Sequence, residues 1–132
     1  LSKYDWLHLH HEDFTGQYGK FYKSFRNATW YKKMENEFIK LASKLGFESV
    51  QKLKKSVAST IKDYIINGGF IFAMCSATDS FDIALSALNV DIVESVFDGT
   101  PADPNLSSKL NFGNTLAFEN FSLYTNPMIY EY

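Results

Sequence analysis

Two segments of the chain have the pattern of β-strands. Between Tyr4 and His10 aromatic and histidine side chains take alternate positions, with Leu7 and Leu9 on the opposite face, which predicts a strand. Residues 70–74 are five apolar residues without alternation, a pattern typical of a strand covered on both faces. The residues between His11 and Asn27 have no clean period, so we predict a long loop there.

Two helical stripes separate these strands. Apolar residues recur at helical spacing from Tyr31 to Leu45, with Thr29 placed to cap the start and Gly46 to end the helix. A second stripe runs from residue 50 to residue 65 and stops at an Asn-Gly-Gly sequence. Strand, helices and strand make a βαβ unit, so we predict that the two strands are parallel members of one sheet.

The pattern becomes weaker after the second strand. A helix is predicted from Ser80 to Leu88, and a further strand from Val90 to Phe97. Residues 115–118 and 121–124 have the composition of strands, although Asn and Gly interrupt the surrounding sequence.

Cys75 stands between the second predicted strand and the helix that follows. A short strand-to-helix turn lies at the carboxyl edge of a parallel sheet, where open α/β folds bind ligands. The first N–H groups of the helix favour an anion and can hold the oxyanion formed at an attacked carbonyl. Cys75 is therefore our candidate nucleophile, although a free cysteine can also simply fill the end of a strand. The candidate substrate-binding residues of this turn, which also suit helix N-caps, are Ser76, Thr78 and Asp79.

Three histidines and two acids crowd the end of the first predicted strand. Because parallel strands end at the same edge, we assign His10 as the catalytic partner of Cys75. His8 and His10 could bind a metal with a nearby carboxylate, but strand alternation sends His11 to the opposite face. We therefore predict no metal site and no cofactor. The remaining substrate-binding candidates are His8, His11, Glu12 and Asp13.

Charge and composition limit the partners. A net charge of -2 provides no broad cationic field, so nucleic acid is not an expected partner. The longest apolar run, residues 70–74, is far shorter than the roughly 20 residues of a membrane helix, so no membrane insertion is expected. A single cysteine excludes an internal disulfide and leaves the compartment open. The oligomeric state also stays open.

Two strings carry a resemblance to a known family. Residues 4–16, YDWLHLHHEDFTG, and residues 68–79, GGFIFAMCSATD, resemble an uncharacterised bacterial family whose members are often labelled asparagine synthetase B. The resemblance covers most of the chain. It implies a class I glutamine-amidotransferase-like domain over residues 1–132, with a flavodoxin-like parallel sheet, helices on both faces and a cysteine elbow. In such enzymes the histidine partner follows the cysteine, whereas no histidine follows Cys75 here.

These observations lead to competing functional hypotheses. The first is an amidotransferase-like or amide-hydrolase domain that acts on a small-molecule or amide substrate through Cys75. The second is a non-catalytic binding module on the same fold, and the third is a metal-dependent hydrolase. We also expect residues 1–132 to be part of a longer chain, whose remainder is then a partner of this domain. Export to the periplasm is expected only if that chain carries a signal peptide.

Overall fold

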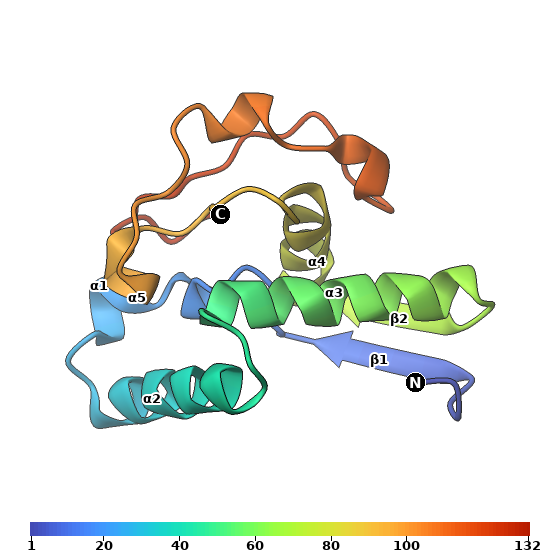
Figure 1. Cartoon of the computed structure of the whole chain (residues 1–132), viewed down its shortest axis with the longest axis horizontal. Coiled ribbons are helices and arrows are strands. Elements are labelled where there is room, and N and C mark those ends of the chain that lie inside the picture. Colours follow the sequence, from blue (N-terminus) through green and yellow to red (C-terminus); the bar gives the residue numbers. More distant parts are fainter.

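The computed structural model, which describes residues 1–132, contains one two-stranded parallel sheet. Strands β1 (Trp6–His10) and β2 (Phe70–Met74) pair with Trp6 opposite Phe70 and His10 opposite Met74 (Figure 1). The protein is thus a mixed α/β structure, as predicted. The parallel direction of the two strands is confirmed as well.

Two long helices make the crossover between the strands, α2 (Thr29–Lys44) and α3 (Val50–Ile66). The loop before α2 contains the short elements η1 (Tyr18–Lys20) and α1 (Tyr22–Phe25). The prediction of two helices in the crossover is confirmed. No helix of the structure combines the length and the apolar character needed to cross a membrane.

Gly46 ends helix α2 as the sequence predicts. It has a φ of 82°, and the Phe47 amide donates back to the Ala42 carbonyl at 2.9 Å, which completes a Schellman turn. The start of the helix differs from the prediction by one residue. Thr29 is the first helical residue, and Ala28 takes the cap position without a side-chain hydrogen bond.

Helix α4 (Ser76–Ser86) follows β2, with Cys75 alone between them, which confirms the predicted order. The helix begins at Ser76, before the apolar pattern starts at Ser80. Beyond it lie only short helical turns, α5 (Ser95–Asp98), η2 (Leu106–Ser108) and η3 (Phe112–Asn114). This last part of the chain arches over α4 and returns toward α1 (Figure 1).

Helices α3 and α4 cover one face of the sheet. Leu9 of β1 packs there in a buried cluster with Ile61 of α3 and with Phe81 and Leu85 of α4. A second cluster joins α2, the start of α3 and the segment after α4. Its larger buried members are Tyr18, Tyr31, Leu53, Ile92, Val93 and Phe97.

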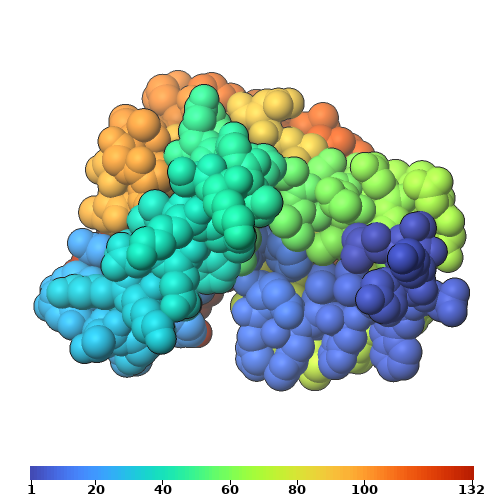
Figure 2. Space-filling model, turned by 60° about the horizontal axis from the view of Figure 1, so that its bottom comes forward, coloured from blue at the N-terminus to red at the C-terminus, as the bar shows by residue number.

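The other face of the sheet is uncovered in this structure. Trp6, Phe70 and Phe72 all lie on it, with 62%, 60% and 46% of their surface exposed. The N-terminal residues, in dark blue, form part of the outer surface in Figure 2. The expectation of helices on both faces is therefore not met within residues 1–132. The apolar run of β2 misled the prediction, because an aromatic face reads as buried whether or not anything covers it.

The predicted strand over residues 90–97 is wrong. The segment runs as a loop into α5, and side chains take the place of a strand ladder. The Ile92 amide donates to the Gln51 side chain at 3.1 Å, and the Val93 amide donates to the Asp91 carboxylate at 3.1 Å. Burial of the apolar side chains produced the strand-like pattern without strand pairing.

The strand-like segments 115–118 and 121–124 also form no strands. The buried Asp82 carboxylate of α4 accepts hydrogen bonds from three successive amides, those of Leu116, Ala117 and Phe118, at 2.7–2.8 Å. The three amides therefore donate to this one side chain and not to the carbonyls of a neighbouring strand. It ties the last part of the chain to the helix after Cys75.

We expect Asp82→Asn to destabilise the fold by about 2 kcal/mol, because an amide offers one acceptor oxygen and turns a donor group toward three donors. Urea unfolding measures the loss, and hydrogen exchange should show faster exchange at residues 116–118. The exposed Asp79, changed to Asn, is the control and should cost less. Unchanged exchange at these amides would contradict the anchoring role.

Lys55 is a second polar group held inside the protein. It is 6% exposed, and its ammonium donates to the Gln51 side chain and to the Val90 carbonyl. Burial lowers the pKa of Lys55 from 10.5 to about 8, although Asp91 and Asp103 act in the opposite direction.

A lowered lysine pKa predicts that stability rises with pH. Between about pH 8 and 10.5 the unfolded chain keeps the Lys55 proton that the folded protein has lost, so alkaline pH favours the folded state. Between about pH 8 and 10.5 we expect the free energy of unfolding of the wild type to increase by roughly 2–3 kcal/mol relative to that of the Lys55→Met variant, which lacks the ammonium group. Parallel pH profiles of the two proteins would contradict the shift.

Candidate functional site

Cys75 has an uncommon backbone conformation. Its φ of 55° and ψ of -141° lie in a region that costs a non-glycine residue about 1–3 kcal/mol. The residue before it ends β2 and the residue after it begins α4, so the chain reverses within one residue. The side chain is exposed. A strained strand-to-helix turn that presents its side chain is the geometry of a nucleophile elbow.

Two hydrogen bonds from Thr78 hold this turn. The Thr78 amide donates to the Cys75 carbonyl at 3.0 Å, and the Thr78 hydroxyl donates to the same oxygen at 2.7 Å. A third bond ties α4 to the loop after β1, because the Ser80 hydroxyl donates to the Glu12 carbonyl at 2.8 Å. The elbow is thereby fixed against the end of the neighbouring strand.

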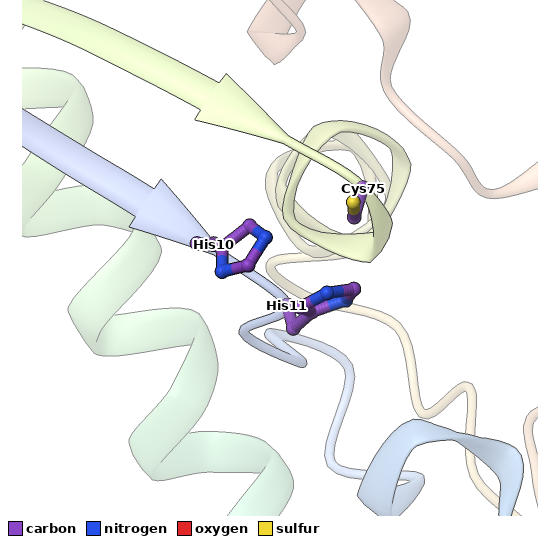
Figure 3. Close-up of side chains that lie close together, drawn as sticks. All are labelled: His10, His11 and Cys75. Carbon is purple, nitrogen blue, oxygen red and sulfur yellow. The ribbon is translucent and has the colours of Figure 1, made fainter.

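The strand register brings two histidines to Cys75. His10 lies opposite Met74, so the next residue of each strand, His11 and Cys75, leaves the sheet at the same edge. The His10 and His11 rings have centroids 4.1 Å apart. One nitrogen of each ring and the Cys75 sulfur all lie within 4.8 Å of one another (Figure 3).

The prediction that His11 faces away from His10 is wrong. Alternation applies only while the backbone stays extended, and His11 has a φ of 65°. The positive φ turns its ring back beside that of His10. One nitrogen of each imidazole therefore lies within 4.8 Å of the Cys75 sulfur, although only His10 was assigned as its partner from the sequence.

A pocket of about 520 Å³ opens at the elbow. Five of the predicted site residues line it, namely His11, Cys75, Ser76, Thr78 and Asp79. His10 lies next to it through its contact with His11. The other lining residues come from the first loop and from the end of the chain: Gly19, Lys20, Phe21, Tyr130, Glu131 and Tyr132.

Three predicted substrate-binding residues do not line the pocket. The His8 Nε2 atom lies 3.3 Å from the Met74 sulfur, on the uncovered face of the sheet. The backbone of Glu12, rather than its side chain, makes the contact with α4. The Asp13 carboxylate accepts from the amide and the hydroxyl of Thr15, at 2.9 and 2.6 Å. Glu12 and Asp13 thus support the loop beside the pocket, whereas His8 lies apart from it.

One side of the pocket was not predicted from the sequence: it is formed by Lys20 and Phe21 together with residues 130–132. The buried Lys20 ammonium donates to the carbonyls of Tyr124 and Asn126, at 2.8 and 3.0 Å. Phe21 stacks on Tyr130 with ring centroids 5.7 Å apart. Burial lowers the pKa of Lys20 to about 8. No local pattern indicated this wall, because its parts are about a hundred positions apart.

A larger hollow, of about 780 Å³, lies between α3 and residues 88–103. Its polar groups bind one another: the Gln51 amide donates to Asp91 at 2.8 Å, and the Thr100 hydroxyl donates to Asp91 at 3.1 Å. It contains no cysteine and no histidine. The smaller pocket at Cys75 is therefore the candidate site.

The chain matches no protein-family model, and comparisons with curated proteins and with solved structures give no match either. The resemblance to proteins labelled asparagine synthetase B stays a prediction.

Glycine should relieve the backbone strain at the elbow. We expect Cys75→Gly to be more stable than Cys75→Ala by about 1 kcal/mol, because both remove the thiol and only glycine tolerates a φ of 55°. Urea unfolding compares the two proteins. Ala73→Gly within β2 is the matched control, and there glycine should cost stability. Equal stability of the two Cys75 variants would show that the turn is unstrained.

Proposed function

We propose that this domain is an amidotransferase-like or amide-hydrolysing unit in which Cys75 is the nucleophile. The observation that carries the proposal is a strained, exposed cysteine at a strand-to-helix turn with two imidazoles within 4.8 Å. A thiol beside a base, at the N-terminus of a helix, has the three parts that acyl transfer needs: nucleophile, proton acceptor and oxyanion donors.

The first step is attack on an amide carbonyl. An imidazole of His10 or His11 takes the thiol proton, and the sulfur forms a bond to the carbonyl carbon, whose oxygen becomes an oxyanion. The first N–H groups of an α-helix have no acceptor within the helix. Those of Ser76 and Ala77 at the start of α4 are thus the proposed oxyanion donors.

The second step releases the amine. The carbon–nitrogen bond breaks, the leaving nitrogen takes the proton from the imidazolium, and a thioester remains on Cys75. Water then attacks the thioester in either case; a hydrolase releases the ammonia to solution, whereas an amidotransferase passes it to an acceptor substrate. The attack of water breaks the carbon–sulfur bond, releases the carboxylic acid and returns a proton to the thiol.

The pocket suits a small amide that carries a positive group. Asp79 and Glu131 bring carboxylates to its lining, while the ammonium of Lys20 is directed to two backbone carbonyls. Tyr130 and Phe21 supply an aromatic wall. An amino-acid amide, with its own ammonium group, matches this combination in charge and size.

The finer fold assignment is also part of the proposal. A class I glutamine-amidotransferase-like domain has a larger flavodoxin-like sheet covered on both sides. The exposed aromatic face formed by Trp6, Phe70 and Phe72 supports such an extension, because large apolar patches are usually covered in the complete protein. The remainder of the chain is the proposed cover.

The competing hypotheses have less support from the geometry. A cysteine that only fills the end of a strand would be buried, whereas the Cys75 thiol is exposed with two imidazoles within 4.8 Å. A hydrolase with a metal on His8 and His10 needs further ligands next to both. The cluster of possible ligands contains His10 but not His8.

Alkylation and amide hydrolysis test the proposal together. We expect iodoacetamide to label Cys75 in the folded full-length protein, and His10→Ala or His11→Ala to slow ammonia release from amino-acid amides by about 100-fold or more. Cys75→Ser should abolish it. His8→Ala, which removes a ring outside the pocket, is the control.

The result that would remove cysteine catalysis is labelling only after unfolding. Labelling of the folded protein without any amide hydrolysis, across a panel that includes glutamine, would favour the binding module. The histidine variant with the larger loss in turnover identifies the base.

A further inference from the structure

The three side chains at the elbow form a ligand set that the proposed reaction does not require. Cysteine sulfur and histidine nitrogen are the commonest zinc ligands in proteins, and a site with three protein ligands leaves the fourth position open. The side chains of His10, His11 and Cys75 offer two nitrogens and one sulfur within 4.8 Å of one another. We propose that this trio binds Zn²⁺ and thereby blocks the Cys75 thiol.

The separation of the ligand atoms is close to what zinc needs. Tetrahedral zinc with Zn–N of about 2.0–2.1 Å and Zn–S of about 2.3 Å holds its ligand atoms about 3.3–3.6 Å apart. From the 4.8 Å limit the ligand atoms must approach one another by about 1.2–1.5 Å. All three side chains are exposed, so rotation about their side-chain bonds can supply this movement.

The backbone already directs the three ligands to one point. His11 and Cys75 both have positive φ, of 65° and 55°, although neither is glycine. The first turns the His11 ring to the side of His10, and Cys75 follows at the end of the neighbouring strand, so that the three side chains lie close together (Figure 3). Binding therefore needs no change of fold.

The surrounding charge also suits a cation. The carboxylates of Asp79 and Glu131 lie in the lining of the same pocket, while the one ammonium there, of Lys20, is bound to carbonyls. A thiolate adds a further negative charge when zinc displaces its proton. His8 and Met74 are in contact with each other farther along the sheet and are not part of this set.

Zinc binding and cysteine catalysis exclude each other at this site. A thiolate bound to zinc has given its electron pair to the metal, and the imidazole nitrogens bound to it cannot accept a proton. Zinc would thus hold the site inactive until it is removed. The inhibitory consequence rests on the proposed function, whereas the binding itself rests only on the geometry.

Cobalt and zinc titrations of the metal-free full-length protein test the binding. We expect Co²⁺ to produce a thiolate-to-cobalt charge-transfer band at one ion per chain, and Zn²⁺ to displace it. His11→Ala and Cys75→Ser should each weaken Zn²⁺ binding by at least about tenfold, and His8→Ala should leave it unchanged. Circular dichroism shows that each variant is folded.

Protection of the thiol is a second measurement: Zn²⁺ should slow iodoacetamide labelling of Cys75 at least about tenfold, and EDTA should restore the labelling rate.

Absence of the cobalt band, or zinc binding that the His11→Ala and Cys75→Ser variants retain, would overturn the site. These measurements use no substrate, so they separate the two proposals. Zinc binding without any amide hydrolysis by the metal-free protein would leave the site in place and remove the proposed enzyme. Hydrolysis that zinc does not inhibit would remove the switch and keep the enzyme.

Discussion

The parallel register between β1 and β2 is the constraint on which the site depends. With His10 opposite Met74, the two strands release His11 and Cys75 at the same edge of the sheet. A shift of the register by one residue would turn every side chain of one strand to its other face. The buried side of the sheet opposes such a shift, because Leu9 packs against α3 and α4 only in the present register. The hydrophobic core therefore sets the positions of the reactive groups.

Local hydrogen bonds then hold the strained residues in place. Thr78 binds the Cys75 carbonyl twice, and Ser80 binds the carbonyl of Glu12, directly after the second histidine. Strained backbone persists only where its surroundings determine it. Here both anchors come from the first turns of α4, so the same helix fixes the elbow and the loop that faces it.

The sequence was sufficient for the elements that follow a regular period. The crossover helices, the parallel strands and the elbow at Cys75 each leave a local pattern of apolar spacing and glycine. The failures have a shared cause, which is that side chains far away in sequence satisfy the backbone. Gln51 binds the amide of Ile92, and Asp82 binds three amides that begin at Leu116. The local composition is the same whether a backbone amide donates to a neighbouring strand or to a distant side chain, so it cannot distinguish the two.

The sequence predicted only those parts of the candidate site that follow from the positions of the strand ends. Cys75 and His10 were placed from the edge rule for parallel sheets, but the turn at His11 depends on a backbone angle that strand alternation does not predict. The wall contributed by Lys20 and Tyr130 depends on contacts across almost the whole chain.

Because three reactive groups converge on one point, the chemistry of that point depends on what occupies it. In the proposed reaction an imidazole takes the proton of the Cys75 thiol, whereas a thiophilic metal ion would bind the same lone pairs. Asp79 and Glu131 favour a cation in either case, be it the ammonium group of a substrate or a metal. Substrate and zinc are then expected to compete for one pocket. The arrangement that would let Cys75 act as the proposed nucleophile is therefore the same arrangement by which a metal ion would block it.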